Sequence, residues 1–301
     1  MNYYNEIKNK LIDNEVYKKV KDYSKNRNDL STYYEVGKLL IKAQGGEERA
    51  KYGDNLIKEY SERLFNDTGR KYNITALKRI RQFYLVVEKG VPLAHQLTWS
   101  HYCELLPLKD INEINYYIKT TMEQCLSKRQ LRERIRNKEY QRLDDKTKLK
   151  LINKEEIDIK DNIKNPIIIK NKLDIDKEIV SEKILQRLIL EDIPSFLEEL
   201  GTGYSFIKNE YKIKLGERYN YIDLLLFNIE YNCYVVIELK VTELKKEHIG
   251  QIQIYMNYID NSLRKITQDK TIGLIICKKD NKYVVEYSSD KRILSREYEL
   301  I

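Results

Sequence analysis

The sequence is poor in the residues that build zinc sites and disulfide frameworks. Its 301 residues include only 4 Cys and 3 His. No two cysteines form a Cys-x-x-Cys pair, and none lies near a histidine at the spacing of metal ligands, so a zinc ion is not expected. Reduced, partly buried thiols are typical of a cytoplasmic protein, and we predict that location.

Long apolar runs and phosphate-binding loops are also missing. No apolar run approaches the roughly 18 residues that cross a membrane. The charged N-terminal stretch does not resemble a signal peptide. The glycine pair Gly201 and Gly203 is not followed by the Lys-Ser/Thr of a nucleotide-binding loop. The sequence therefore gives no support to a membrane protein or a nucleotide hydrolase.

Charge is what the chain has in abundance. Charged residues make up 34% of the sequence, and the net charge is +8 with a pI near 8.9. A mildly basic chain has some preference for polyanions such as nucleic acid, although a generally lysine-rich composition explains the excess equally well. The length predicts two domains, since domains commonly contain about 100–200 residues.

Residues 1–140 show the apolar spacing of helices. One apolar face carries Val36, Leu39 and Leu40, and Gly45 ends that pattern, as glycine often does at a helix terminus. We therefore predict an all-α N-terminal domain. Its expected helices are 30–44, 55–65, 74–87, 99–106, 111–125 and 127–139.

Residues 141–165 are almost all charged or amide side chains, and they form either a linker or a long solvated helix. Residues 166–301 then change to an α/β pattern: a helix, a three-strand meander, a second helix and another strand. The helix between the third and fourth strands implies a crossover and a parallel strand pair. The expected elements are helix 181–200, strands 204–215, 221–228 and 233–241, helix 247–261, strand 271–277 and a weaker strand at 282–287.

Three charged side chains interrupt the apolar strands of this second domain. Asp223 lies in the run Tyr-Ile-Asp-Leu-Leu-Leu-Phe, and Glu238 and Lys240 lie in Cys-Tyr-Val-Val-Ile-Glu-Leu-Lys-Val. A period of two puts Glu238 and Lys240 on one face of their strand, and the hairpin neighbour about 4.8 Å away carries Asp223. Burying a carboxylate without a partner is costly, so something must compensate these charges.

A divalent cation is one means of compensation. Mg²⁺, or Mn²⁺ in its place, prefers carboxylate, water and phosphate oxygens, so Asp223 and Glu238 are candidate metal ligands. Such an ion lowers the pKa of a bound water and offsets charge on a phosphate, and Lys240 would stabilise the same charge. The alternative is structural: Glu238 and Lys240 pair with each other, and Asp223 lies at a solvated strand end.

The helix after these strands carries Gln251 and Tyr255, which are spaced i and i+4 and so share one helical face. Their polar ends could reach the same site as the strand charges. In a chain with 25 Tyr, however, this spacing also arises by chance.

Taken together, these motifs resemble the PD-(D/E)xK nuclease superfamily, and the Gln-x-x-x-Tyr element resembles its RecB-like branch. Longer segments are similar to the YhcG-type bacterial nucleases of that superfamily, including their N-terminal helical domain. The resemblance covers about residues 30–140 and 165–301. The segments are YYEVGKLLIKAQGGEERAKYGDNLIKEYSERL, LKRIRQFYLVV, QLTWSHYCELL, FLEELGTGYSFIKNEYKI, YIDLLLF, CYVVIELK and GQIQIYMNYID.

The resemblance implies a restriction-endonuclease-like core in the second domain and an endonuclease that depends on Mg²⁺ or Mn²⁺. By position, Asp223 and Glu238 match the two metal-binding acids, and Lys240 matches the motif lysine. Gln251 and Tyr255 match the motif of the following helix, so all five residues are candidates for catalysis.

Two details of the family pattern stay open or differ. The family often adds an acid from the first helix, and both Glu182 and Glu199 qualify. The proline that usually precedes the first acid is absent, since Ile222 precedes Asp223. Proline takes no part in metal chemistry, so we still expect an active site.

Basic side chains gather on the helix expected at 74–87, after a short turn. This order is similar to a helix-turn-helix reader and fits the winged-helix or helix-turn-helix-like domain that the resemblance implies. Lys78, Arg79 and Arg81 would contact phosphates, and Gln82 would read base edges. A solvated amphipathic helix explains the same residues equally well.

Three functions agree with these observations. The first is a metal-dependent nuclease acting on DNA, with RNA as another possible substrate. The second is a non-catalytic protein that binds nucleic acid. The third is an assembly subunit of a defence or restriction system, whose helical domain binds other subunits. Nucleases of this fold often pair to cut both strands, so the resemblance also allows a homodimer.

Overall fold

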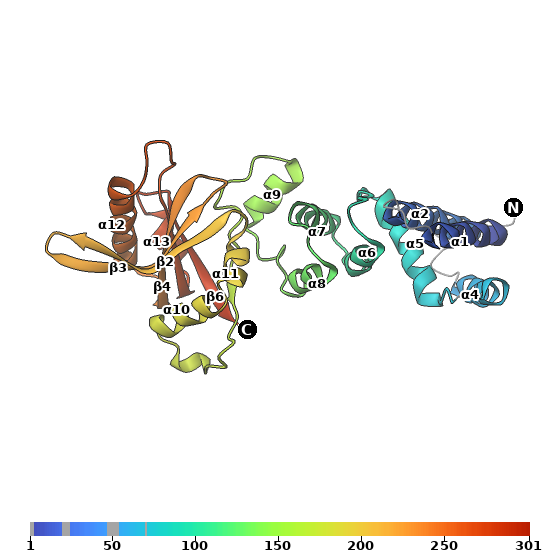
Figure 1. The fold of residues 1–301 in the computed structure, drawn as a ribbon, viewed down its shortest axis with the longest axis horizontal. Coiled ribbons are helices and arrows are strands. Elements are labelled where there is room, and N and C mark those ends of the chain that lie inside the picture. Colours follow the sequence, from blue (N-terminus) through green and yellow to red (C-terminus); the bar gives the residue numbers. More distant parts are fainter. Residues whose placement is uncertain (1–2, 20–24, 47–53, 70) are drawn as a thin grey trace. The chain divides into compact units, whose positions relative to one another are not determined.

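The computed structural model describes residues 3–19, 25–46, 54–69 and 71–301. It divides the chain into two compact units, Met1–Tyr140 and Gln141–Ile301. The first unit is helical, and the second has a mixed sheet covered by helices, which confirms the predicted fold class (Figure 1). Part of the charged stretch 141–165 forms helix α9 (Asp145–Asn153) within the second unit. A linker role for the rest of that stretch stays a prediction.

The helices of the first unit begin where the sequence provides capping side chains. Asn73 accepts a hydrogen bond from the Ala76 N–H at 2.8 Å and caps α5. Ser127 and Gln130 form the capping box of α8. Side-chain capping of this kind satisfies N–H groups that have no partner inside the helix. The helices are α1 (Tyr3–Lys19), α2 (Lys25–Ala43), α4 (Asp54–Thr68), α5 (Ile74–Glu88), α6 (Trp99–Leu105), α7 (Ile111–Glu123) and α8 (Lys128–Arg136).

A small residue brings helices α2 and α5 close together. A Cβ atom at Gly37 of α2 would lie 2.6 Å from the Ile80 carbonyl oxygen and 2.7 Å from the Tyr84 Cβ. Because one of these atoms belongs to the backbone, a larger side chain at this position would push the two helices apart.

The second unit contains one six-stranded sheet with the strand order β1-β6-β5-β4-β3-β2. Strands β2, β3 and β4 form the predicted antiparallel meander, and β4 pairs with β5 in parallel, as the crossover helix requires. The elements are β1 (Ile167–Ile169), η1 (Lys177–Ile179), α10 (Glu182–Glu191), α11 (Ile193–Leu200), β2 (Tyr204–Leu215), β3 (Arg218–Asn228), β4 (Cys233–Glu243), α12 (Lys246–Ser262), β5 (Ile272–Lys279), α13 (Lys282–Glu286) and β6 (Ile293–Leu300).

Helices cover both faces of this sheet. One core cluster packs α10 and α11 against the sheet, and Val235, Ile237 and Leu239 of β4 point into it. The other cluster packs α12 against the opposite face, where Val236 points. Since the central strands are buried on both sides, their sequences are nearly continuous apolar runs. Glu238 and Lys240 fall in register with Val236 and so lie toward the α12 side.

Three expectations about this unit were wrong or incomplete. The segment expected as a strand at 282–287 is the short helix α13 (Lys282–Glu286). It lies in the crossover between two parallel strands, β5 and β6, so the chain must return across the sheet there. The helix expected at 181–200 is two helices, because Asp192 ends α10 and caps α11. Strands β1 and β6 were not predicted from the sequence.

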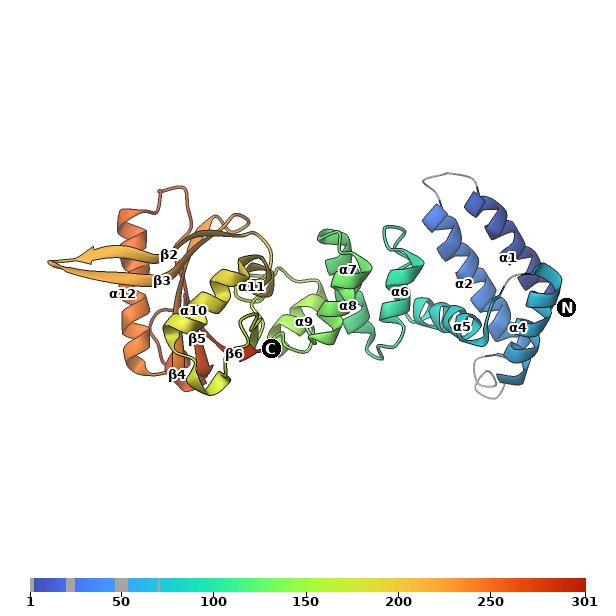
Figure 2. The same ribbon diagram turned by 60° about the horizontal axis from the view of Figure 1, so that its bottom comes forward.

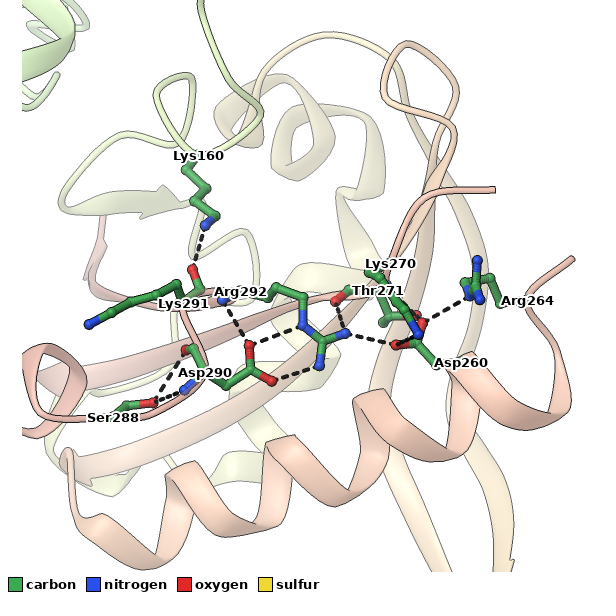
Figure 3. A network of polar contacts seen from close by, with 9 residues as sticks. All are labelled: Lys160, Asp260, Arg264, Lys270, Thr271, Ser288, Asp290, Lys291 and Arg292. Carbon is green, nitrogen blue, oxygen red and sulfur yellow. Dashed lines mark hydrogen bonds and ion pairs between the residues drawn. The ribbon is translucent and has the colours of Figure 1, made fainter. Parts of the chain in front are cut away.

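A polar network fixes the far end of α12 to the starts of β5 and β6 (Figure 3). The Asp260 carboxylate accepts hydrogen bonds from the Thr271 N–H and hydroxyl at 2.9 and 2.7 Å and from Arg292 at 2.7 Å. Arg292 also binds Asp290 at 2.6 Å. Burial would raise the pKa of Asp260, but these hydrogen bonds outweigh it and hold the pKa below its usual value. The network is therefore structural.

Candidate active site

Strands β3 and β4 bring the two predicted strand acids next to each other. Their pairing begins at Asn228 opposite Cys233 and runs to Leu224 opposite Ile237, so the next step along both strands sets Asp223 against Glu238. At this point the carboxylate of Asp223 takes the place of a backbone acceptor: its Oδ2 atom accepts the Leu239 N–H at 2.8 Å. Asp223 is thus half-buried beside the sheet's centre, and it does not lie at a solvated strand end.

Glu238 and Lys240 form a buried ion pair. Their residues are only 2% and 8% exposed, and the Lys240 Nζ donates to the Glu238 Oε1 at 2.8 Å. The pairing that the structural alternative predicted is therefore present. It satisfies only half of the carboxylate, because the Glu238 Oε2 is buried without a hydrogen-bond partner in the described part of the chain. Such an atom is costly unless something else binds it.

The first helix of the domain contributes one acid to this group. Glu182 is the first residue of α10, and its Oε1 lies 3.6 Å from the Lys240 Nζ. Glu199 lies elsewhere: it binds the Arg142 guanidinium through both oxygens, at 2.6 and 3.1 Å, and accepts the Ile168 N–H. The structure thus brings Glu182, and not Glu199, to the strand acids.

Helix α12 places Gln251 and Tyr255 together one turn apart. The Gln251 Nε2 donates to the Tyr255 hydroxyl at 3.1 Å. Tyr255 is buried within the α12-side core. The charges of Glu238 and Asp223 act on its hydroxyl, and burial raises the pKa of Tyr255. The predicted helical face therefore packs on the side of the sheet toward which Val236 points.

Negative charge is crowded at this site. Burial first, and then the charge of Asp223, raises the pKa of Glu238 to about 7 against the opposing pull of Lys240. Burial also raises the pKa of Asp223, and the charge of Glu182 acts in the same direction. For Lys240, burial works to lower the pKa, but the surrounding carboxylates outweigh it and raise the pKa. Without a cation, the site holds its carboxylates at an electrostatic cost.

Two further side chains touch or face the group. The Gln186 side chain of α10 donates to the Asp223 carbonyl oxygen at 2.9 Å and so fixes the backbone that carries the acid. No signal in the sequence marks it, because Gln186 stands next to the equally polar Arg187 in an amphipathic helix. His248 is half-buried, and its Nδ1 accepts the Lys245 N–H at 3.2 Å at the start of α12.

Within the ranges that the structure describes, no three His, Cys, Asp or Glu side chains already surround a common point in the manner of a closed metal site. The residues nevertheless fit a small divalent cation. Asp223 and Glu238 supply carboxylate oxygens from adjacent positions, and the Oε2 of Glu238 has no other partner among the described residues. Hard oxygen donors with room for water are what Mg²⁺ binds.

The predicted basic residues of the first unit lie on α5. Arg79 and Gln82 are exposed, whereas Lys78 and Arg81 are half-buried. Arg81 donates to the Gln44 side chain at 3.1 Å, so its guanidinium takes part in packing α5 against the end of α2. Helix α5 follows α4 after a short connection, as predicted. Contact of these residues with nucleic acid stays a prediction.

No helix in the described ranges is long and apolar enough to span a membrane.

Residues 160–301 match the family described as the YhcG PDDEXK nuclease domain, and residues 9–142 match the DUF1016 N-terminal domain. YhcG of Escherichia coli (strain K12), a protein named as a candidate nuclease, is 25% identical over 310 residues, which cover 90% of this chain and 83% of that protein. These matches confirm the family resemblance.

Two solved structures match part of this chain. The crystal structure of a repair endonuclease from Pyrococcus abyssi is 16% identical with a TM-score of 0.28, over 40% of this chain and 47% of that one. A structure of EndoMS in complex with double-stranded DNA is 19% identical with a TM-score of 0.29, over 40% of this chain and 44% of that one. The matches span less than half of either structure.

Proposed function

We propose that this chain, which combines a YhcG PDDEXK nuclease domain with a DUF1016 N-terminal domain, is a metal-dependent endonuclease. It would hydrolyse phosphodiester bonds in DNA. The observation that carries the proposal is the Glu238 carboxylate. It is buried, has a raised pKa and, among the described residues, keeps one oxygen without a partner beside Asp223. A protein that used this fold only as a clamp would gain nothing from charges held at such a cost.

Asp223 and Glu238 would hold the Mg²⁺ or Mn²⁺ ion, with Glu182 as a third carboxylate near it. When bound, the cation supplies a water of lowered pKa and offsets negative charge on the phosphate. The half-free carboxylate of Glu238 and the exposed part of Asp223 are the atoms available for this purpose. Gln186 holds the backbone of Asp223 in place through its carbonyl oxygen.

Lys240 and the α12 pair would act on the substrate. The ammonium of Lys240 is oriented by Glu238 at 2.8 Å and Glu182 at 3.6 Å, and its raised pKa keeps it charged. It would stabilise negative charge on the scissile phosphate. The Tyr255 hydroxyl accepts from Gln251, which leaves its own hydrogen available for a phosphate oxygen or the attacking water.

The first unit would bind the DNA. Exposed Arg79 and Gln82 on α5 would contact phosphates and base edges, and Lys78 and Arg81 would add positive charge, in the manner of a helix-turn-helix reader. Association with a second copy, or with other subunits of a restriction or defence system, belongs to the same proposal. So does activity on RNA, which offers the same phosphodiester chemistry.

The test is cleavage of plasmid and single-stranded DNA in the presence of Mg²⁺, Mn²⁺ or EDTA. We expect the wild type to cut with either cation and not with EDTA, and Glu238→Ala to cut with neither. Equal cleavage by the wild type and this variant would refute the proposed site. An RNA substrate under the same conditions measures the preference between the two nucleic acids.

A further inference from the structure

The β2–β3 hairpin extends past the sheet as a two-stranded arm, made of residues 211–222. It crosses α12, and its turn projects beyond that helix in both views (Figures 1 and 2). The arm begins where β3 separates from β4, next to Asp223. The candidate active site therefore lies at the base of the arm.

The two faces of the arm differ completely in character. The inner face carries Ile213 and Ile222, which are 1% and 0% exposed and belong to the core cluster around α12. The outer face carries Lys212 opposite Tyr221 and Lys214 opposite Tyr219. Both lysines are exposed, and the two tyrosines are 55% and 52% exposed at positions 219 and 221. Packing thus explains the inner face and leaves the outer face unexplained.

The outer face presents positive charge and aromatic rings together. The Lys212 Nζ lies 3.7 Å from the centre of the Tyr219 ring, which shows that these side chains share one surface. Within the described ranges, neither Lys212 nor Lys214 forms an ion pair with an acid. The nearest acids along the arm are Glu210 at its base and Glu217 in its turn. Two lysines on one strand opposite two exposed tyrosine rings on the other suit a ligand that has both phosphates and flat rings.

We propose that this outer face binds a single-stranded segment of DNA that continues from the bond being cut. The choice of ligand rests on the proposed nuclease function. Lys212 and Lys214 would contact successive phosphates, and Tyr219 and Tyr221 would stack on unpaired bases. Residues two apart on a strand are separated by about 7 Å, so Tyr221 stands one such step from Asp223 and Tyr219 stands two steps away. A strand lying along the outer face would therefore lead toward Asp223, the strand acid at the base of the arm.

A single strand fits this surface better than a duplex. Stacking on tyrosine requires a base whose face is open, and bases in a duplex are covered by their neighbours. The inference therefore extends the proposed function: the preferred substrate carries unpaired nucleotides beside the scissile bond, as a flap, gap or overhang does.

The test is binding of the full chain to fluorescent single-stranded and blunt duplex DNA, followed by anisotropy in EDTA over a range of salt concentrations. We expect Tyr219→Ala/Tyr221→Ala to weaken single-strand binding at least tenfold. We expect Lys212→Ala/Lys214→Ala to lower the slope of log K against log salt by about 1.4, since each phosphate contact on a single strand contributes about 0.7. Binding to the blunt duplex should change less than threefold in the tyrosine variant.

Matched controls separate contact from misfolding. Tyr219→Phe/Tyr221→Phe keeps the rings, and Lys212→Arg/Lys214→Arg keeps the charge, so both should bind as the wild type does. The variant Lys265→Ala/Lys270→Ala removes the same charge from the segment after α12 and should leave single-strand binding unchanged. Its exposed lysines lie in the loop before β5.

Single-strand binding within twofold of the wild type in both alanine pairs would overturn the inference. So would an equal loss in the Lys265/Lys270 control, or a loss on the blunt duplex as large as that on the single strand. Because EDTA prevents cleavage, binding is read independently of catalysis. A protein that needs the arm for binding but never cuts DNA would refute the proposed enzyme and leave the arm's role standing.

Discussion

The charge on Glu238 should destabilise the metal-free protein at neutral pH, and removing it should make the fold more stable. Its pKa rises from 4.5 to about 7 in the folded chain, a difference of about 2.5 units. Because the folded state binds the proton more tightly than the unfolded state, stability is highest below pH 4.5 and is lost as the pH rises toward 7. At about 1.4 kcal/mol per unit, the cost reaches roughly 3 kcal/mol above pH 7.

Glu238→Gln tests this reasoning, because the amide keeps the shape of the protonated acid and cannot ionise. Its carbonyl oxygen can still accept a hydrogen bond from Lys240. The Lys240 ammonium also retains a second carboxylate nearby, since its Nζ lies 3.6 Å from the Glu182 Oε1. The free energy of unfolding in EDTA should therefore favour the variant over the wild type by up to about 3 kcal/mol at pH 8, and the advantage should disappear near pH 4.5.

Urea unfolding at a series of pH values measures the difference directly, provided that the m-values of the two proteins agree. Titrations shared by both proteins cancel when one curve is subtracted from the other. A difference that stays constant with pH, or a variant less stable than the wild type at pH 8, would contradict the account of a strained carboxylate.

Other variants probe the remaining parts of the fold and site. Glu182→Gln should lower cleavage and weaken Mg²⁺ binding with little change in thermal stability, whereas Glu199→Gln should lower stability by about 3 kcal/mol because its buried arginine partner loses an ion pair; the reverse outcome would exchange their roles. Asp260→Asn should cost about 3 kcal/mol in urea unfolding, while Lys270→Ala, which removes an exposed partner of that carboxylate, should cost less than about 1 kcal/mol. Gly37→Ala should lower the melting temperature through about 1–3 kcal/mol of overpacking between α2 and α5, and an unchanged melting temperature would mean that the two helices can move apart freely.

The strand acids could be located from the sequence because the signal was local. A period of two in β4 fixes which residues share a face, and charged residues in an apolar run stand out wherever the strand is buried on both sides. Glu238 and Lys240 met both conditions. The sequence left the register with the neighbouring strand open, and the structure supplies it: pairing runs to Leu224 opposite Ile237, one step short of Asp223 and Glu238.

Features that depend on tertiary contacts could not be predicted from the sequence. Glu182 and Glu199 have equally plausible spacing, and only the presence of Arg142 beside Glu199 separates a structural acid from one at the site. Strand β6 begins with Ile293 and Leu294 and then has three polar residues in a row, so it lacks the apolar run that marked β4 and β5. The segment 282–287 contains two valines, yet the parallel crossover turns it into a helix.

The most direct test of the central claim is cleavage of DNA in Mg²⁺ by wild type and Glu238→Gln, under conditions in which the unfolding curves show both proteins folded. The account predicts that the variant is at least as stable as the wild type and yet cuts at least about a thousandfold more slowly, since it lacks a carboxylate that holds the cation. Cleavage at the wild-type rate by a folded Glu238→Gln protein would contradict the claim that this buried carboxylate serves catalysis.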